Sequence, residues 1–179
     1  MHTHRRASGK RQRSDPQKSL VGFFVGEVHY AVDIGSVFQI LNPLPVTVLP
    51  HLAGVVAGVA EIRGEVIPVL DLRARFGLPI VAPTRRSKWV LVDVGGRTAA
   101  LAVDSVSDVF AKSSVESRGT PALGRGDEAR GIIGVFDVSG KLTFLLAPTQ
   151  FRAILDALDN GPVSPDAHPD APVASRGTT

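Results

Sequence analysis

The chain has 179 residues, of which 44% are hydrophobic and 21% are charged, and it contains no cysteine. This length and composition indicate an ordinary globular domain, or two small lobes, with enough apolar residues to form a core. The missing cysteines exclude disulfide scaffolds, thiolate metal sites and cysteine nucleophiles, and they fit an intracellular chain.

The net charge of +3 comes from the ends of the sequence. Residues 1–18 contain six basic residues and one acidic residue, whereas residues 159–179 contain one basic and three acidic residues. The 140 residues between them carry 13 charges of each sign. We therefore expect a disordered basic tail over 1–18, an electrically neutral folded domain over 19–158 and a disordered tail over 159–179.

Neither end has the features of a targeting signal. Arg5 and Arg6 are followed by polar residues instead of an apolar stretch. The longest uninterrupted apolar run covers residues 52–60, whereas a membrane-spanning helix needs about 20 residues. The sequence predicts a cytoplasmic protein with no direct membrane insertion.

Short Val/Ile-rich segments recur through the domain, separated by Gly, Pro or Asp, and this spacing predicts an all-β fold. In chain order, the expected strands are 20–25, 28–33, 46–49, 55–62, 65–70, 88–94, 98–103, 107–111, 132–138 and 141–146.

Three short helices are expected between or after the strands. Asp33 is a suitable N-cap for a helix that ends at Asn42, and Asp71 for a helix that ends at Gly77. Pro148 at a first-turn position begins the third, at 148–158, which carries one apolar stripe.

A faint repeat divides the domain. Two hairpins of similar build, at residues 25–37 and 94–106, suggest two related lobes, roughly 19–80 and 81–158. Residues 79–87 are the expected crossing between the lobes. Residues 112–131 form a long polar loop in the second lobe.

Residues that could carry catalysis or bind metal are scattered. There is no nucleophile motif, and the five histidines have no metal-ligand spacing. His29 is expected to point outward from its strand. Most carboxylates fall at strand ends, where Asp caps backbone N–H groups. We expect no catalytic residues, no metal and no cofactor.

One segment has a more specific pattern. It is Gly58-Val-x-x-Ile-Arg-Gly-x-Val-Ile-Pro-Val-Leu-Asp-Leu-Arg73, which places Arg63 at a glycine turn between two strands. Tyr30-Ala-Val-Asp-Ile precedes it, and Leu101-Ala-Val-Asp and Ile133-Gly follow. In this order the motifs resemble the CheW family, the adaptors that couple chemoreceptors to the CheA histidine kinase.

The resemblance covers roughly residues 19–158 and implies a fold of two five-stranded SH3-like barrels. It also implies two partners, the helical hairpin tip of a chemoreceptor and the regulatory domain of a CheA-type kinase, at the inner face of the membrane. The receptor-binding residues that it implies are Val37, Gln39, Ile40, Arg63, Ala100, Val106 and Val109. The kinase-binding residues are not assigned.

Two other functions are compatible with the residues. A stand-alone barrel protein could bind nucleic acid or an anionic surface through its basic N-terminal arm, and an enzyme could use a carboxylate pair such as Asp104 and Asp108. The neutral charge of the domain argues against a nucleic-acid surface on the fold. We therefore favour a non-catalytic adaptor, with no nucleic acid among its partners.

Overall fold

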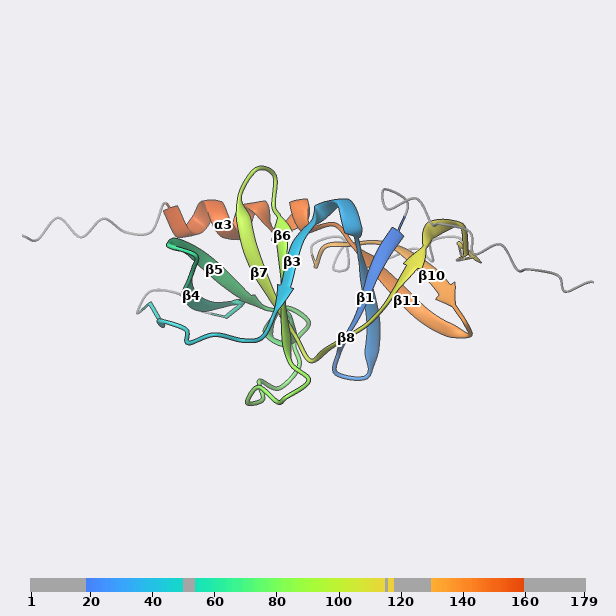
Figure 1. Ribbon diagram of the computed structural model, residues 1–179, viewed down its shortest axis with the longest axis horizontal. Helices are drawn as coiled ribbons and strands as arrows, with labels where there is room; N and C mark the ends of the chain where they lie inside the picture. The colour runs from blue at the N-terminus through green and yellow to red at the C-terminus, as the bar shows by residue number, and fades with distance from the viewer. Residues whose placement is uncertain (1–18, 50–53, 115, 118–129, 160–179) are drawn as a thin grey trace, which may run out of the picture.

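The computed structural model of the chain describes residues 19–49, 54–114, 116–117 and 130–159. Within these residues, the strands form two sheets that lie side by side along the long axis of the molecule (Figure 1). This arrangement confirms the all-β prediction. The predicted tails 1–18 and 159–179, and with them the basic arm that binds nucleic acid, lie outside the described ranges except at Asp159, which is the last residue of the helix Arg152–Asp159 and not part of a disordered tail.

The first sheet has six strands among the described residues. Their order is β8 (Ser105–Ala111), β1 (Ser19–Val25), β2 (Val28–Asp33), β11 (Lys141–Leu146), β10 (Ile132–Val138) and β9 (Glu116–Ser117). All neighbours are antiparallel except β2 and β11, which run parallel.

The second sheet has five strands among the described residues. Their order is β3 (Val37–Leu41), β6 (Lys88–Asp93), β7 (Thr98–Val103), β5 (Glu65–Asp71) and β4 (Val56–Ile62). The described segment after β3 returns to β4 through an isolated bridge between Thr47 and Val59.

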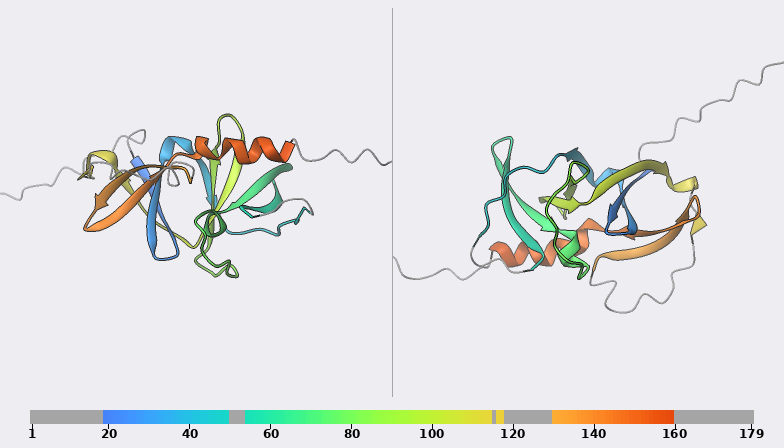
Figure 2. Two further views of the ribbon diagram at one scale, coloured as in Figure 1. Left: turned by 180° about the vertical axis from the view of Figure 1, so that it is seen from behind. Right: turned by 90° about the horizontal axis from the view of Figure 1, so that it is seen from below.

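Helical structure is confined to short segments in the part of the chain that is described. They are the 3₁₀ turns Ile34–Ser36, Lys112–Ser114 and Pro148–Phe151, and the helices α1 (Leu72–Arg75) and α3 (Arg152–Asp159). The expected helices after Asp71 and at 148–158 are confirmed, and Figures 1 and 2 show α3 across one end of the second sheet.

Two predicted elements are wrong. Asp33 caps only the turn Ile34–Ser36, and the residues predicted to continue as a helix form β3, which pairs with β6. Residues 46–49 do not form a strand beyond the single bridge at Thr47. Backbone pairing with β6 gives the extended form of β3 an advantage over an isolated short helix, whose nucleation is unfavourable.

The division into lobes 19–80 and 81–158 is also corrected by the topology. The first sheet takes strands from residues 19–33 and from residues 105–146, whereas the second sheet takes the chain between them. The parallel pairing of β2 with β11 requires this interleaving, because it joins strands from both halves of the domain. The two sheets are therefore not independent halves of the sequence.

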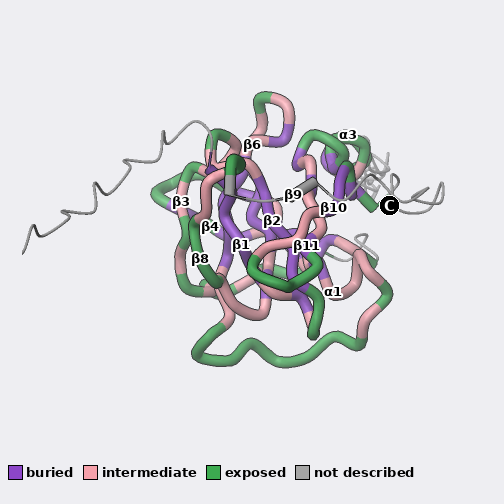
Figure 3. Tube along the Cα trace, turned by 90° about the vertical axis from the view of Figure 1, so that its right-hand side faces the viewer, coloured by how far each residue is buried: buried purple, intermediate pink, exposed green. Residues whose placement is uncertain are grey.

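The larger hydrophobic core lies between the sheets. It includes Phe23 and Val32 from the first sheet, Val90 and Leu101 from the second sheet, and Leu155 from α3. The buried residues run through the centre of the molecule in Figure 3. A smaller core lies on the other face of the second sheet and contains Trp89, Leu91, Ala100, Ile62 and Ile67.

Candidate partner-binding surface

Strand β3 stands at the edge of the second sheet and separates two surfaces. Val37 pairs with Val92 and Ile40 pairs with Val90, so both face the core shared by the two sheets. Gln39 pairs with Leu91 and faces the smaller core. A bulge between Val37 and Gln39 makes this arrangement possible, because it inserts one extra residue into the alternation.

Strand β8 stands at the edge of the first sheet and has a similar irregularity. Val106 pairs with Phe23 and Val109 pairs with Val21, with a register shift between them. Phe23 and Val21 belong to the shared core, so both valines of β8 face the same side.

The structure thus places four predicted residues at the edge of the shared core: Val37, Ile40, Val106 and Val109. We call these four residues the aliphatic margin. Ile40 is 37% exposed and Val109 is 57% exposed, whereas Val37 and Val106 are partly buried against the core. Its exposed members leave apolar surface that a partner could cover.

Arg63 lies at the other side of β3. It occupies the tip of the β4–β5 hairpin, is exposed and has a φ of 55°. Together with Phe38 and Gln39 it lines a cleft of about 290 Å³, completed by Ile62, Glu65, Ile67, Leu91 and Thr98. Phe38 is 63% exposed. The cleft therefore combines an exposed aromatic ring, an amide and a guanidinium from two separate segments.

Ala100 does not belong to either surface. Its side chain is 0% exposed and packs in the smaller core. It pairs with Leu91 on β6 and with Val69 on β5. A partner cannot contact it without disrupting the barrel, so its contribution to any site is to support the strands around it.

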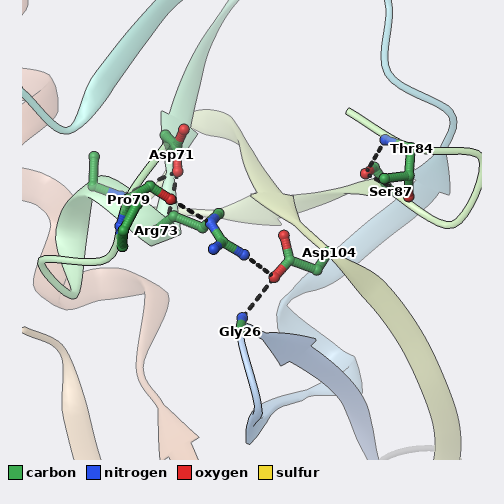
Figure 4. Close-up of polar contacts among 8 residues, drawn as sticks. Gly26, Asp71, Arg73, Pro79, Thr84, Ser87 and Asp104 are labelled. Atoms are coloured by element: carbon green, nitrogen blue, oxygen red, sulfur yellow. Dashed lines mark hydrogen bonds and ion pairs between the residues drawn. The ribbon is translucent and has the colours of Figure 1, made fainter. Parts of the chain in front are cut away.

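A polar network joins the sheets close to the start of β8 (Figure 4). The Asp104 carboxylate oxygen Oδ2 accepts hydrogen bonds from the Gly26 backbone N–H and from Arg73 Nη1, each at 2.6 Å. Asp104 and Arg73 line a small cavity of about 70 Å³. Spacing in the sequence does not reveal this network, because Gly26, Arg73 and Asp104 are far apart along the chain.

His29 is buried, contrary to the prediction that it points outward. Its Nδ1 lies 2.7 Å from Thr143 Oγ1 and its Nε2 lies 2.9 Å from Ser107 Oγ. Gly22 leaves room for this contact, since a Cβ there would lie 2.8 Å from Nε2. Strands β1, β8 and β11 surround the imidazole of His29 on β2 and bury it. The hydroxyl groups of Thr143 and Ser107 supply hydrogen-bond partners for its two ring nitrogens.

The surroundings of His29 lower the pKa of its imidazole. Burial lowers the pKa of His29 below the usual 6.5, the charge of Lys141 lowers it further, and Asp108 opposes both effects. The imidazole borders a cavity of about 210 Å³ that is also lined by Phe24, Phe110 and Asp108. Because Asp108 lines this cavity and Asp104 lines a different one, the structure does not bring them together as a carboxylate pair.

Within the described ranges, no cluster of three or more His, Asp or Glu side chains could hold a metal ion. In the same residues, every helix is too short or too polar to cross a membrane.

Comparisons with known proteins agree with this geometry. The family model of the CheW-like domain matches residues 19–153. The chemotaxis protein CheW of Rhizobium meliloti is 33% identical over 129 residues, which cover 72% of this chain and 83% of that protein. Protein FrzA of Myxococcus xanthus is 30% identical over 128 residues, covering 70% of this chain and 78% of FrzA.

A solved structure gives the same result for the fold. The scaffolding protein TtCheW from Thermoanaerobacter tengcongensis superposes with a TM-score of 0.65 and 28% identity, covering 73% of this chain and 89% of that one. The family model covers every described strand of both sheets, and on this basis the chain belongs to the CheW family.

Proposed function

We propose that this chain is a non-catalytic cytoplasmic adaptor that couples chemoreceptors to a CheA-type histidine kinase at the inner face of the membrane. The names of its relatives support the proposal, since they are a chemotaxis protein and a scaffolding protein. In this function the protein needs surfaces for partners rather than a catalytic centre, and it uses neither a cofactor nor a metal.

The observation that carries the proposal is the position of β3. This edge strand has the aliphatic margin on one side and the cleft of Phe38, Gln39 and Arg63 on the other. An amphipathic helical hairpin laid along β3 would cover Phe38 and Ile40 with its apolar face. The Arg63 guanidinium would donate hydrogen bonds to oxygen atoms on the hairpin and fix its orientation.

The kinase needs a second binding surface on this protein, apart from the receptor surface. Its regulatory domain is expected to share the two-barrel fold and to join this protein barrel to barrel. Strands at a sheet edge have unpaired backbone groups, so such an association costs little rearrangement. We assign no residues of this chain to the kinase.

The proposal is tested by measuring receptor binding and kinase stimulation together. Val109→Glu places a charge on the aliphatic margin and should weaken capture of the cognate receptor cytoplasmic fragment by more than about tenfold, as expected for a buried hot spot. Kinase activity in the reconstituted mixture should fall in parallel. The adaptor alone should neither hydrolyse nor transfer a phosphoryl group.

Ile133→Glu is the matched control, because Ile133 is 51% exposed but lies on β10, away from the aliphatic margin. It should bind the receptor fragment normally. Equal loss in both variants would mean that the margin is not the receptor site. Failure of the unaltered protein to stimulate any CheA-type kinase encoded beside it would overturn the adaptor function itself.

A further inference from the structure

One carboxylate holds the connection between the two sheets. Asp104 follows the last residue of β7 in the second sheet and precedes the first residue of β8 in the first sheet. Its backbone N–H donates to the Phe24 carbonyl oxygen at 3.0 Å, and its Oδ2 accepts from the Gly26 N–H at 2.6 Å. Both contacts tie it to the β1–β2 hairpin of the first sheet.

Arg73 brings the second sheet to the same carboxylate. It lies in α1, directly after β5, and Asp71 holds the start of α1 by accepting hydrogen bonds from the backbone N–H groups of Arg73 and Ala74. The Arg73 Nη1 donates to Asp104 Oδ2 at 2.6 Å, while its Nε donates to the Pro79 carbonyl oxygen at 2.7 Å. Figure 4 shows the guanidinium between these two acceptors.

This contact has a property that the shared core lacks. The core between the sheets is mainly aliphatic, and apolar burial stabilises without fixing direction. A planar guanidinium bonded to two oxygen atoms defines both distance and orientation. Arg73 and Asp104 are also partly buried, with side-chain exposures of 19% and 29%, so solvent screens the pair less than a fully exposed one.

We propose that Arg73 and Asp104 form a positioning pair that fixes the angle between the two sheets and thereby the spacing of β3 and β8. Strand β8 begins at Ser105, directly after Asp104, and carries Val106 and Val109 of the aliphatic margin. The second sheet carries Val37 and Ile40. The pair therefore tunes the receptor surface without touching the receptor, an assignment that rests on the proposed function.

The angle can be measured without any receptor. Because the chain has no cysteine, Glu61→Cys on β4 and Leu142→Cys on β11 give one spin label on each sheet, both at exposed positions. The distribution of distances between the labels reports how firmly the sheets are held. Arg73→Ala and Asp104→Asn should broaden or shift it at a temperature where circular dichroism shows a folded protein.

Two further variants, one at Arg73 and one at Arg86, make the test specific. Arg73→Lys keeps the charge but cannot reach both acceptors in the same planar geometry, so its distribution should lie between those of the unaltered protein and the Arg73→Ala variant. Arg86→Ala removes an arginine of the same 70–90 region that is outside the pair, and its distribution should not change. A distribution unaffected by Arg73→Ala would overturn the proposal.

The second measurement is affinity for the receptor cytoplasmic fragment. Arg73→Ala should weaken it by roughly five- to tenfold, a typical coupling between separate sites. Broadened distances with unchanged affinity would overturn the claim that the pair tunes the receptor surface. If the unaltered protein binds no receptor fragment, the proposed function fails, whereas the label distances still decide whether the pair fixes the angle.

Discussion

At the scale of single residues, Arg63 combines an exposed cation with an unusual backbone. Its φ of 55° is in the left-handed region, and the following Gly64 has a φ of 83°. Two-residue hairpin turns of this kind favour Asn or Gly at the first position, because in other residues the close approach of Cβ to the backbone is unfavourable. Arg63 thus places a guanidinium at the cleft, although its left-handed backbone conformation makes the turn less stable than Asn or Gly would.

This cost leads to opposite predictions for folding and binding. Arg63→Gly should raise the thermal stability slightly, and Arg63→Ala should change the free energy of unfolding by no more than about 1 kcal/mol. Both should weaken receptor binding by about 1 to 3 kcal/mol, as for a lost charge-assisted hydrogen bond. Melting curves and receptor pull-down on the same samples check this. A large loss of stability would make Arg63 structural, and normal binding would exclude it from the site.

His29 gives a prediction of pH dependence. Its folded-state pKa is lowered by burial and by Lys141, so the folded state binds its proton less readily than the unfolded state does. The contribution of neutral His29 to stability is therefore complete above the usual value of 6.5 and is lost as the pH falls below it. Melting at about pH 7.5 and about pH 5.5 brackets the unperturbed histidine pKa.

The control for this measurement is His29→Gln, which keeps hydrogen-bonding groups near Ser107 and Thr143 but cannot titrate. The unaltered protein should lose more stability between the two pH values than the variant. Equal losses in the two proteins would show that His29 is not the titrating group.

At the scale of elements, most strands followed directly from alternation and β-branched content. The bounds predicted for 28–33, 98–103, 132–138 and 141–146 are those of β2, β7, β10 and β11. The two-residue strand β9 has too little pattern to be recognised, because two residues define no period. Pairing with β10, a tertiary contact, is what makes it a strand.

The sequence of strand β3 resembles that of a short amphipathic helix. The bulge between Val37 and Gln39 places Val37 and Ile40, three residues apart, on the same face. Apolar residues three apart are also the mark of a helix, and Asp33 before them is a good helix cap. A bulged edge strand thus imitates an amphipathic helix, and only the register with β6 distinguishes them. The same spacing recurs at Val106 and Val109 on β8.

At the scale of the whole molecule, the sequence indicated the fold class but not the path of the chain. The faint repeat suggests two lobes that follow one another along the chain. In the structure, β2 near the start of the domain pairs with β11 near its end, and the second sheet is formed by residues between them. Long-range pairing leaves no local pattern. The seven predicted site residues divide between the aliphatic margin, the cleft and the buried Ala100. This division could not be predicted from the sequence, because it depends on which face of its strand each residue occupies.

Interleaving predicts how the molecule unfolds. Each sheet contributes residues to the shared core, and the strands of the first sheet come from both ends of the domain, so neither sheet can keep its packing when the other is lost. Unfolding by urea should therefore be one cooperative transition. The chain has one tryptophan, in the second sheet, and one tyrosine, in the first sheet, so each sheet carries its own spectroscopic probe.

Trp89 is buried in the smaller core of the second sheet, and Tyr30 is buried in the shared core, stacked on Phe76 with ring centroids 4.6 Å apart. Trp89 fluorescence and the near-ultraviolet dichroism of a Trp89→Phe variant, which isolates Tyr30, should each match the far-ultraviolet transition of the same protein. A Trp89 signal that changes at a different urea concentration from the backbone would mean that the second sheet unfolds separately. Coincident curves would mean that the two sheets are one folding unit, because the shared core can form only when both are present.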